Sequence, residues 1–142
     1  KIRTTGGTNC YTAYELARGL IETEYPVGEW NVYVWHFSDG EDFATERTVE
    51  ELKRLFAIGI NMFGYGEIDP DGGHPMGIGS KLMMAFQEAL PMQTFSEDDF
   101  HGIVGKNDTP FLGVALEKKE HILMALKQFL KKDRWSHDEK RT

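Results

Sequence analysis

The stretch W-N-V-Y-V-W-H-F-S-D-G-E-D, residues 30–42, decides the fold of this chain. Residues 31–37 are almost all β-branched or aromatic, a composition that favours a strand buried on both faces inside a parallel sheet. The run stops at Ser38-Asp39-Gly40, so the strand delivers a carboxylate at its C-terminal end. In open α/β sheets this end of the strands is where ligands bind. The sequence therefore predicts a ligand site that contains Asp39.

Amphipathic helical patterns alternate with strand patterns along the rest of the chain. The first helix is expected to begin at a cap on Thr8 or Asn9 and to end at Pro26. Its predicted buried face consists of the apolar residues that recur at helical spacing: Ala13, Leu16, Ala17, Leu20 and Ile21. A capping box at residues 48–51 predicts the start of a second helix, which ends at Gly59.

The second half of the chain contains one clear strand and two clear helices. Residues 60–65 read as a buried strand, and residues 78–89 as a helix closed by Pro91. Residues 91–113 carry a poor signal, with one short strand at residues 100–104. The last helix is amphipathic, and its predicted apolar face consists of Ile122, Leu126, Phe129 and Leu130.

Strands that alternate with helices form βαβ units around a parallel sheet. The pattern therefore predicts an α/β domain of the three-layer, Rossmann-like class with a mainly parallel sheet. Two convincing strands are too few for a stable sheet. We therefore expect the first strands to lie before Lys1, so that residues 1–142 are the C-terminal portion of one domain and residues 132–142 its flexible tail. An incomplete sheet would expose strand edges, so a homodimer is a further expectation.

The composition narrows the functional classes. The formal net charge of −7 argues against nucleic acid as a partner, because phosphate-binding surfaces need clustered Lys and Arg. A single cysteine, Cys10, excludes an internal disulfide and favours a reducing compartment. No apolar run approaches the roughly 18 residues of a membrane span. The sequence therefore predicts a cytoplasmic protein that binds neither nucleic acid nor a membrane.

Thr8 and Asp39 form the leading candidate site. Thr8 lies on the loop before the first helix and Asp39 on the loop after the first strand. A hydroxyl and a carboxylate supply the oxygen ligands that Mg²⁺ or Mn²⁺ prefers. Ser38, Glu41 and Asp42 form the possible rim of this metal site. The alternative interpretation is structural, with Thr8 as a helix cap and Asp39 in a solvent-exposed turn.

Other candidate motifs are weaker. Residues 69–72, D-P-D-G, begin like a calcium loop, but Ser80 stands where that loop needs a glutamate, so a turn is the better interpretation. Cys10 and His36 lack the signature of a Cys–His nucleophile. Cys10 is therefore expected to be a small buried residue at a helix start, and His36 a hydrogen-bonded core or strand-end residue. The sequence also lacks a phosphate-binding loop.

An ordered set of motifs resembles a known family. A Gly6-Gly7-Thr8 turn that opens a helix, followed by a hydrophobic strand that ends in Ser38-Asp39-Gly40, resembles the second half of a von Willebrand factor A-type domain. With E-Y-P at residues 24–26 and W-N-V-Y at residues 30–33, the set resembles more narrowly the YhbH/YeaH family of sporulation- and stress-associated bacterial proteins of unknown function.

This resemblance implies a non-enzymatic module that binds a partner protein at a metal-ion-dependent adhesion site. In that site Thr8 and Asp39 would hold Mg²⁺ or Mn²⁺ together with an Asp-x-Ser-x-Ser segment. No aspartate of this sequence begins such a segment, so we expect weak or no metal binding by this chain. The implied partners are a PrkA-type serine kinase and a SpoVR-type protein, in bacterial stress or sporulation signalling.

A competing hypothesis is a Mg²⁺-dependent phosphoryl-transfer or hydrolytic enzyme that uses Asp39, Glu41 and Asp42. The sequence offers no identifiable general base, phosphate cradle or nucleophile, which favours the binding module. A third hypothesis is a purely scaffolding role.

Overall fold

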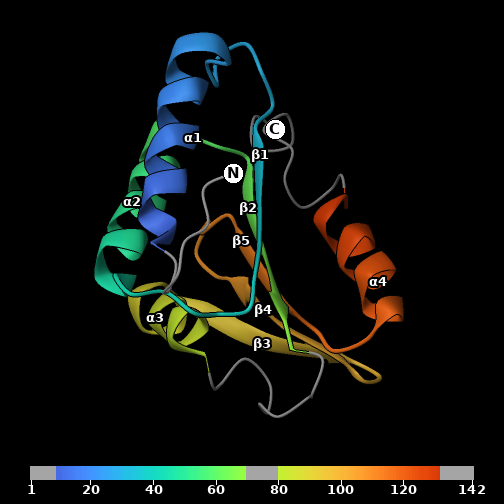
Figure 1. The fold of residues 1–142 in the computed structure, drawn as a ribbon. Coiled ribbons are helices and arrows are strands. Elements are labelled where there is room, and N and C mark those ends of the chain that lie inside the picture. Colours follow the sequence, from blue (N-terminus) through green and yellow to red (C-terminus); the bar gives the residue numbers. More distant parts are fainter. Residues whose placement is uncertain (1–8, 70–79, 132–142) are drawn as a thin grey trace, which may run out of the picture.

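The computed structural model describes residues 9–69 and 80–131 (Figure 1). Their elements are, in chain order, α1 (Cys10–Glu24), β1 (Tyr33–Ser38), α2 (Thr45–Ile58), β2 (Met62–Ile68), α3 (Lys81–Ala89), β3 (Met92–Glu97), β4 (Phe100–Gly105), β5 (Phe111–Leu116) and α4 (Lys119–Phe129). Four predictions concern residues outside these ranges: Thr8, the turn after Asp69, the start of the third helix at Ile78, and the tail at residues 132–142.

The five strands form one mixed sheet in the order β1-β2-β5-β4-β3. β1, β2 and β5 run parallel, whereas β4 lies antiparallel to both β5 and β3. The predicted α/β class is confirmed, with parallel strands at the centre of the fold. Sequence analysis missed β3 and β5, because turn residues interrupt the apolar pattern in the segment of residues 91–113, where both strands begin.

The helices cover both faces of the sheet and create two separate hydrophobic clusters (Figure 1). α1, α2 and α3 pack on one face, where buried residues such as Tyr14, Leu52 and Phe86 surround Phe63 of β2. α4 packs on the opposite face, where Phe129 contacts the cluster that contains Met62 and the β5 residues. The three-layer arrangement is therefore observed within the described residues.

The predicted burial of the first strand is wrong. Among the strands of residues 9–69 and 80–131, β1 forms one end of the sheet, and Tyr33, Trp35 and Phe37 are 44, 40 and 45% exposed. The alternate side chains of Val34 and His36 point toward the three-helix side, where Val34 packs against the core and His36 meets Tyr14 of α1. The composition of a strand reveals that it can be buried, but its neighbours decide whether it is.

The prediction of a capping box at residues 48–51 is also wrong. α2 begins at Thr45, so Thr48 already lies in the first turn, where its N–H donates to the carbonyl of Ala44. Glu51 is buried and forms ion pairs with Arg18 and Arg54 instead of capping the helix. The predicted end of the helix is confirmed, since Gly59 has the left-handed φ of 96° that favours glycine.

The helical period of α1 and α4 was predicted correctly, but the buried faces of both helices include residues other than those predicted. α1 buries Cys10, Tyr14 and Ile21, whereas Leu16 and Leu20 are 76 and 48% exposed. α4 buries His121, Ala125 and Phe129, whereas two residues of its predicted face, Ile122 and Leu130, are 51 and 63% exposed. Within the described residues no helix combines the length and the apolar character needed to cross a bilayer.

Candidate functional site

The candidate site lies where the parallel strands β1 and β2 end. Ser38, the last residue of β1, is directly paired with Glu67 near the end of β2, and residues 39–44 form the loop that follows β1. Two helices begin beside this loop: the N–H of Cys10 in α1 donates to Asp42, and the N–H of Leu82 in α3 donates to the carbonyl of Gly40. The loop leads directly into α2 and is also held by N–H groups in the first turns of α1 and α3.

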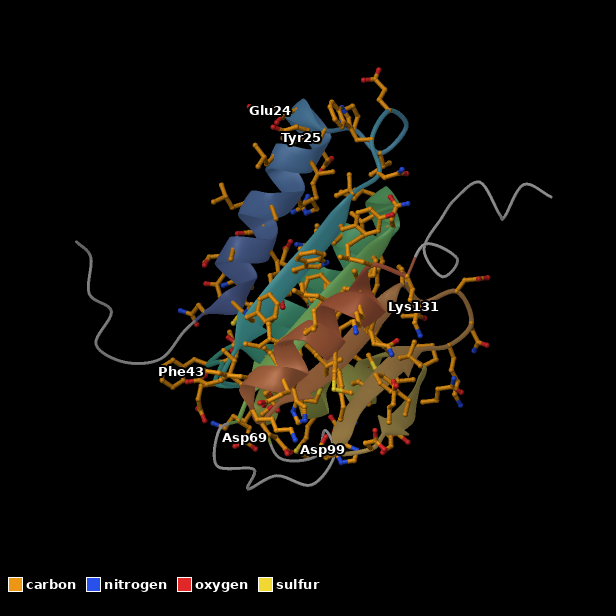
Figure 2. All side chains as sticks on the ribbon, turned by 90° about the vertical axis from the view of Figure 1, so that its right-hand side faces the viewer. Glu24, Tyr25, Phe43, Asp69, Asp99 and Lys131 are labelled. Carbon is orange, nitrogen blue, oxygen red and sulfur yellow. The ribbon has the colours of Figure 1, made fainter. Side chains whose placement is uncertain are left out.

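Figure 2 shows which labelled residues lie at the end of the molecule where β1 and β2 terminate, and which lie at the opposite end. Phe43 of the loop and Asp69, which follows β2, lie at the same end as Asp99, opposite Glu24 and Tyr25. Phe43 is 69% exposed although it is a large apolar side chain. The end at which the parallel strands terminate therefore presents both carboxylates and an exposed aromatic ring.

Asp42 organises the loop from inside. Its carboxylate is 3% exposed and accepts hydrogen bonds from the Cys10 N–H at 3.1 Å and from the Thr48 hydroxyl at 2.6 Å. A longer contact of 3.5 Å comes from the N–H of Ala44. Both oxygens are thus used within the protein, and the buried charge lies at the N-terminus of α1, where the helix dipole favours an anion. Asp42 is a structural anchor of the loop.

Asp39 is the exposed carboxylate of the same loop. Its Oδ1 accepts a hydrogen bond from the N–H of Glu41 at 3.0 Å, which forms a tight local turn. Its Oδ2 makes no hydrogen bond with the residues that the structure describes. The negative charge of Asp39 also acts on the first residue of α1, because it contributes to raising the pKa of the Cys10 thiol. Asp39 and the N-terminal end of α1 are therefore neighbours.

Gly40 allows the loop to approach β2 and α3 closely. Its φ of +89° is a left-handed conformation, and a Cβ at this position would lie 2.3 Å from the Ser80 Cβ and 2.4 Å from the Glu67 Oε1. Ser38 supports this turn because its hydroxyl accepts a hydrogen bond from the Gly40 N–H at 3.0 Å. Only glycine fits between the two neighbours without displacing them.

Glu67 is a carboxylate that sequence analysis did not select. It is 5% exposed, and its Oε1 accepts a hydrogen bond from the Tyr65 hydroxyl at 3.1 Å. Burial, followed by the nearby charge of Glu67, raises the pKa of Tyr65 well above its usual range. A glutamate at the end of a buried apolar strand was the available signal, since charged residues are rarely buried without a partner or a function.

Titratable groups behind the loop are held in their neutral forms. Burial, with smaller contributions from Asp42 and Asp39, raises the pKa of the Cys10 thiol to about 11. Burial lowers the pKa of His36, whose Nδ1 lies 2.7 Å from the Tyr14 hydroxyl. These environments confirm that Cys10 is a small buried residue and that His36 is hydrogen-bonded within the strand. Because the raised pKa keeps the Cys10 thiol protonated, Cys10 is a poor nucleophile.

The structure brings four of the five predicted site residues into one loop region. Ser38, Asp39, Glu41 and Asp42 are consecutive or nearly so, with Asp39 and Glu41 exposed and Asp42 buried. Thr8 lies outside the described residues, one position before Asn9. Across residues 9–69 and 80–131, no three side chains of His, Cys, Asp or Glu are grouped so as to hold a metal ion. A cation at Asp39 would therefore need ligands of another kind or from elsewhere.

The fold and the loop define an α/β protein with a carboxylate-bearing loop at the carboxyl end of its parallel strands. Within that class, the chain belongs to the family described as "Protein of unknown function (DUF444)", whose model matches residues 1–133. The chain is 34% identical over 130 residues to a UPF0229 protein of Ruminiclostridium cellulolyticum. It is 29% identical over 134 residues to a UPF0229 protein of Bacillus cereus strain B4264.

These relatives are much longer than the chain. The two alignments cover 90 and 91% of this chain but only 28% of each relative. No solved structure matches the chain.

Proposed function

We propose that the protein is a non-enzymatic binding module that recognises an acidic group of a partner protein at Ser38 and the loop of residues 39–44. One observation carries the proposal: the loop presents the exposed carboxylate of Asp39 while Asp42, three residues later, fastens the same loop to the interior. A functional group on a rigidly held loop is what recognition requires. This loop also follows a parallel strand at its carboxyl end, where α/β proteins bind ligands.

In this proposal Asp39 and Thr8 hold a divalent cation, Mg²⁺ or Mn²⁺, as the resemblance to a von Willebrand factor A-type domain suggests. The chemistry of Asp39 supports it, because an exposed carboxylate oxygen without a hydrogen bond among the described residues is a suitable ligand for a hard cation. When bound, the cation would offer an open position to a carboxylate of the partner. Ser38 and Glu41 would form the rim of the site, whereas Asp42 would serve as its anchor.

The partner follows from the family rather than from the geometry. The resemblance to the YhbH/YeaH proteins suggests a PrkA-type serine kinase or a SpoVR-type protein, in bacterial stress or sporulation signalling. Exposed Phe43 lies in the same loop as Asp39 and supports a protein as the ligand, since an aromatic side chain beside a charged contact is typical of protein interfaces.

Calorimetric titration of the full-length polypeptide with MgCl₂ or MnCl₂ tests the cation. We expect the Asp39→Ala and Thr8→Ala variants each to weaken binding by about tenfold or more, because each removes an oxygen ligand. The matched control is Glu88→Ala, which removes an exposed carboxylate from α3. Binding that is equal in the wild type, Asp39→Ala and Glu88→Ala would contradict the proposed site.

A second experiment tests the partner and separates the binding module from an enzyme. Interferometry with an immobilised PrkA-type kinase is expected to detect binding that EDTA and Asp39→Ala both remove. Hydrolysis of a phosphoester that requires Mg²⁺ and disappears in Asp39→Ala would instead establish the enzymatic alternative.

A further inference from the structure

Phe43 is an exposed aromatic residue that the start of α2 does not use. It precedes Ala44, the N-cap residue of α2, and an apolar side chain in this position often packs against the fourth residue of the helix. Here the fourth residue is Thr48, which is buried and donates a hydrogen bond from its hydroxyl to Asp42. Phe43 is instead 69% exposed, so its ring contributes little to the beginning of the helix.

Arg47 is a cation that α2 does not use either. It lies in the first turn of the helix, where the helix dipole disfavours a positive charge. In the described part of the chain its guanidinium makes no ion pair, although Glu50 and Glu51 follow at the spacings that favour one. Glu51 pairs with two other arginines instead. The charge of Arg47 therefore does not stabilise the helix that carries it.

Tyr11 of α1 holds the Arg47 side chain in place. The guanidinium carbon lies 3.8 Å from the centre of the Tyr11 ring, which is a cation–π contact. A guanidinium that stacks on a ring keeps the N–H groups at its edge available, and this planar fork matches the two oxygens of a carboxylate. Because the stack already orders the side chain, less rotamer freedom is lost when a ligand binds. Arg47 is therefore suited to bind a carboxylate from another molecule.

The three side chains lie beside the loop of the candidate site. Tyr11 follows Cys10, whose N–H donates to Asp42, and Phe43 follows Asp42 directly. α1 and α2 pack side by side and begin at the same end of the molecule (Figure 1). Aromatic residues and arginine are enriched where proteins contact one another. Tyr11, Phe43 and Arg47 therefore have the composition of a contact surface, which we call the Phe43–Arg47 surface.

The carboxylates near this surface limit the kind of ligand that it can bind. Glu41 of the loop and Glu46 and Glu50 of α2 are all exposed. They would repel a run of acidic residues, whereas a single carboxylate can still reach the guanidinium of Arg47. The exposed ring of Phe43 favours a large apolar side chain next to that carboxylate.

We infer that the Phe43–Arg47 surface binds a segment of the partner protein in which one acidic residue lies beside a large apolar residue. The carboxylate of the segment accepts hydrogen bonds from Arg47, and the apolar side chain packs on Phe43. This inference rests on the proposed function, because it takes the loop after β1 as the place of recognition. It does not depend on a cation at Asp39.

Selection from a display library of random peptides on the immobilised full-length protein tests the chemistry of the ligand. We expect the enriched peptides to contain one Asp or Glu beside a Leu, Phe or Trp, and the same selection on the Arg47→Gln variant to lose the enrichment of the acidic residue. Enrichment of basic peptides, or of the same acidic peptides by the wild type and by Arg47→Gln, would overturn the inference.

Fluorescence anisotropy with a labelled synthetic peptide of the enriched sequence measures the affinity. Arg47→Gln is expected to weaken binding by about tenfold or more, because the paired hydrogen bonds to the carboxylate are lost. The matched control is Lys53→Gln, which removes an exposed cation from the same helix and should leave the affinity unchanged. Tyr11→Phe keeps the ring beneath the guanidinium and should bind as the wild type does, whereas Tyr11→Leu should weaken binding.

Each affinity is measured both in MgCl₂ and in EDTA, which separates this surface from the proposed cation site. A loss caused by Arg47→Gln that persists in EDTA supports the inference, even if the cation titration fails. Equal affinities of Arg47→Gln and Lys53→Gln would overturn the inference without affecting the cation site. Thermal denaturation supplies the last control: Arg47→Gln should unfold at the wild-type temperature, and a clear fall would overturn the inference by giving Arg47 a structural role.

Discussion

The backbone N–H of Cys10 donates a hydrogen bond across 3.1 Å to the carboxylate of Asp42, which lies 32 positions later in the chain. This bond joins the first turn of α1 to the loop after β1. Asn9, one of the two residues expected to cap α1, makes no side-chain capping bond, and the distant Asp42 accepts the hydrogen bond from the Cys10 N–H instead. The start of the helix and the position of the candidate site are therefore set by the same interaction.

Replacing Asp42 by alanine is expected to lower the free energy of unfolding by about 3 kcal/mol. The substitution leaves the buried Cys10 N–H and Thr48 hydroxyl without their acceptor. Urea denaturation measures the change. Asp39→Ala is the matched control and should change stability by less than about 0.5 kcal/mol, because its carboxylate is exposed. Equal losses in the two variants would show that Asp42 does not anchor the loop.

Gly40→Ala is expected to destabilise the protein by about 2 kcal/mol or more. The new Cβ would combine a left-handed φ of +89° with a 2.3 Å approach to the Ser80 Cβ and a 2.4 Å approach to Glu67. Gly19→Ala is the control, since a Cβ there meets nothing within 4 Å and lies in the middle of α1. Thermal denaturation should show this control to be more stable than the wild type by about 0.5–1 kcal/mol.

The elements from α1 to β2 could be predicted in their order from sequence because each depends on local periodicity, whereas β3 and β5 were missed. The run of residues 31–37 predicted a strand, and Gly59 predicted a helix end, because both signals are contained in neighbouring residues. The exposure of Trp35 could not be predicted in this way. Burial of a strand depends on which elements lie beside it, and the sequence of the strand does not contain that information.

The candidate site shows the same limit. A strand that ends in Asp39 predicted a carboxylate at the carboxyl end of the sheet, and the structure places it there. The pattern placed Asp42 on the possible rim of the site beside the predicted ligand Asp39, whereas the structure buries Asp42 and uses both of its carboxylate oxygens within the protein. Their roles differ because α1 and Thr48 approach Asp42 from distant parts of the chain, which no local pattern records.

The contact between Tyr14 and His36 predicts both a stability change and a pH dependence. Tyr14→Phe removes the hydroxyl that lies 2.7 Å from Nδ1 of the partly buried imidazole, so we expect a loss of about 1 kcal/mol. Tyr33→Phe is the control, because the Tyr33 hydroxyl makes no hydrogen bond among the described residues. Urea denaturation of both variants at neutral pH measures the difference, and equal losses would contradict the prediction.

The pKa of His36 adds the pH dependence. Burial lowers this pKa below the ordinary value of 6.5, so the unfolded chain takes up the proton more readily than the folded protein. The stabilising contribution is complete above pH 6.5 and is lost as the pH falls through the lowered pKa. Titration of the His36 ring by NMR should therefore give a midpoint below that of a histidine in the unfolded chain; a midpoint at or above 6.5 would contradict the buried environment.

The thiol of Cys10 reports on the position of Asp39. Its pKa of about 11, against an ordinary value of 9.0, means that the folded protein holds the thiol proton more tightly than the unfolded chain does. The resulting stabilisation is complete below pH 9.0 and is lost as the pH rises toward 11. Reaction of the native protein with a disulfide reagent should accordingly be slow at neutral pH and should accelerate toward pH 11.

Titration of the Cys10 thiol in the Asp39→Asn variant tests whether Asp39 lies beside the start of α1. Removing the charge of Asp39 takes away one of the contributions that raise the Cys10 pKa, so the midpoint of the thiol reaction should fall. Glu88→Gln removes a carboxylate from the exposed face of α3 and should leave the midpoint unchanged. A midpoint that is the same in both variants would show that Asp39 does not lie beside the start of α1. Thr8 precedes that helix by two positions, so the same result would also remove the geometric basis for a cation shared by Thr8 and Asp39.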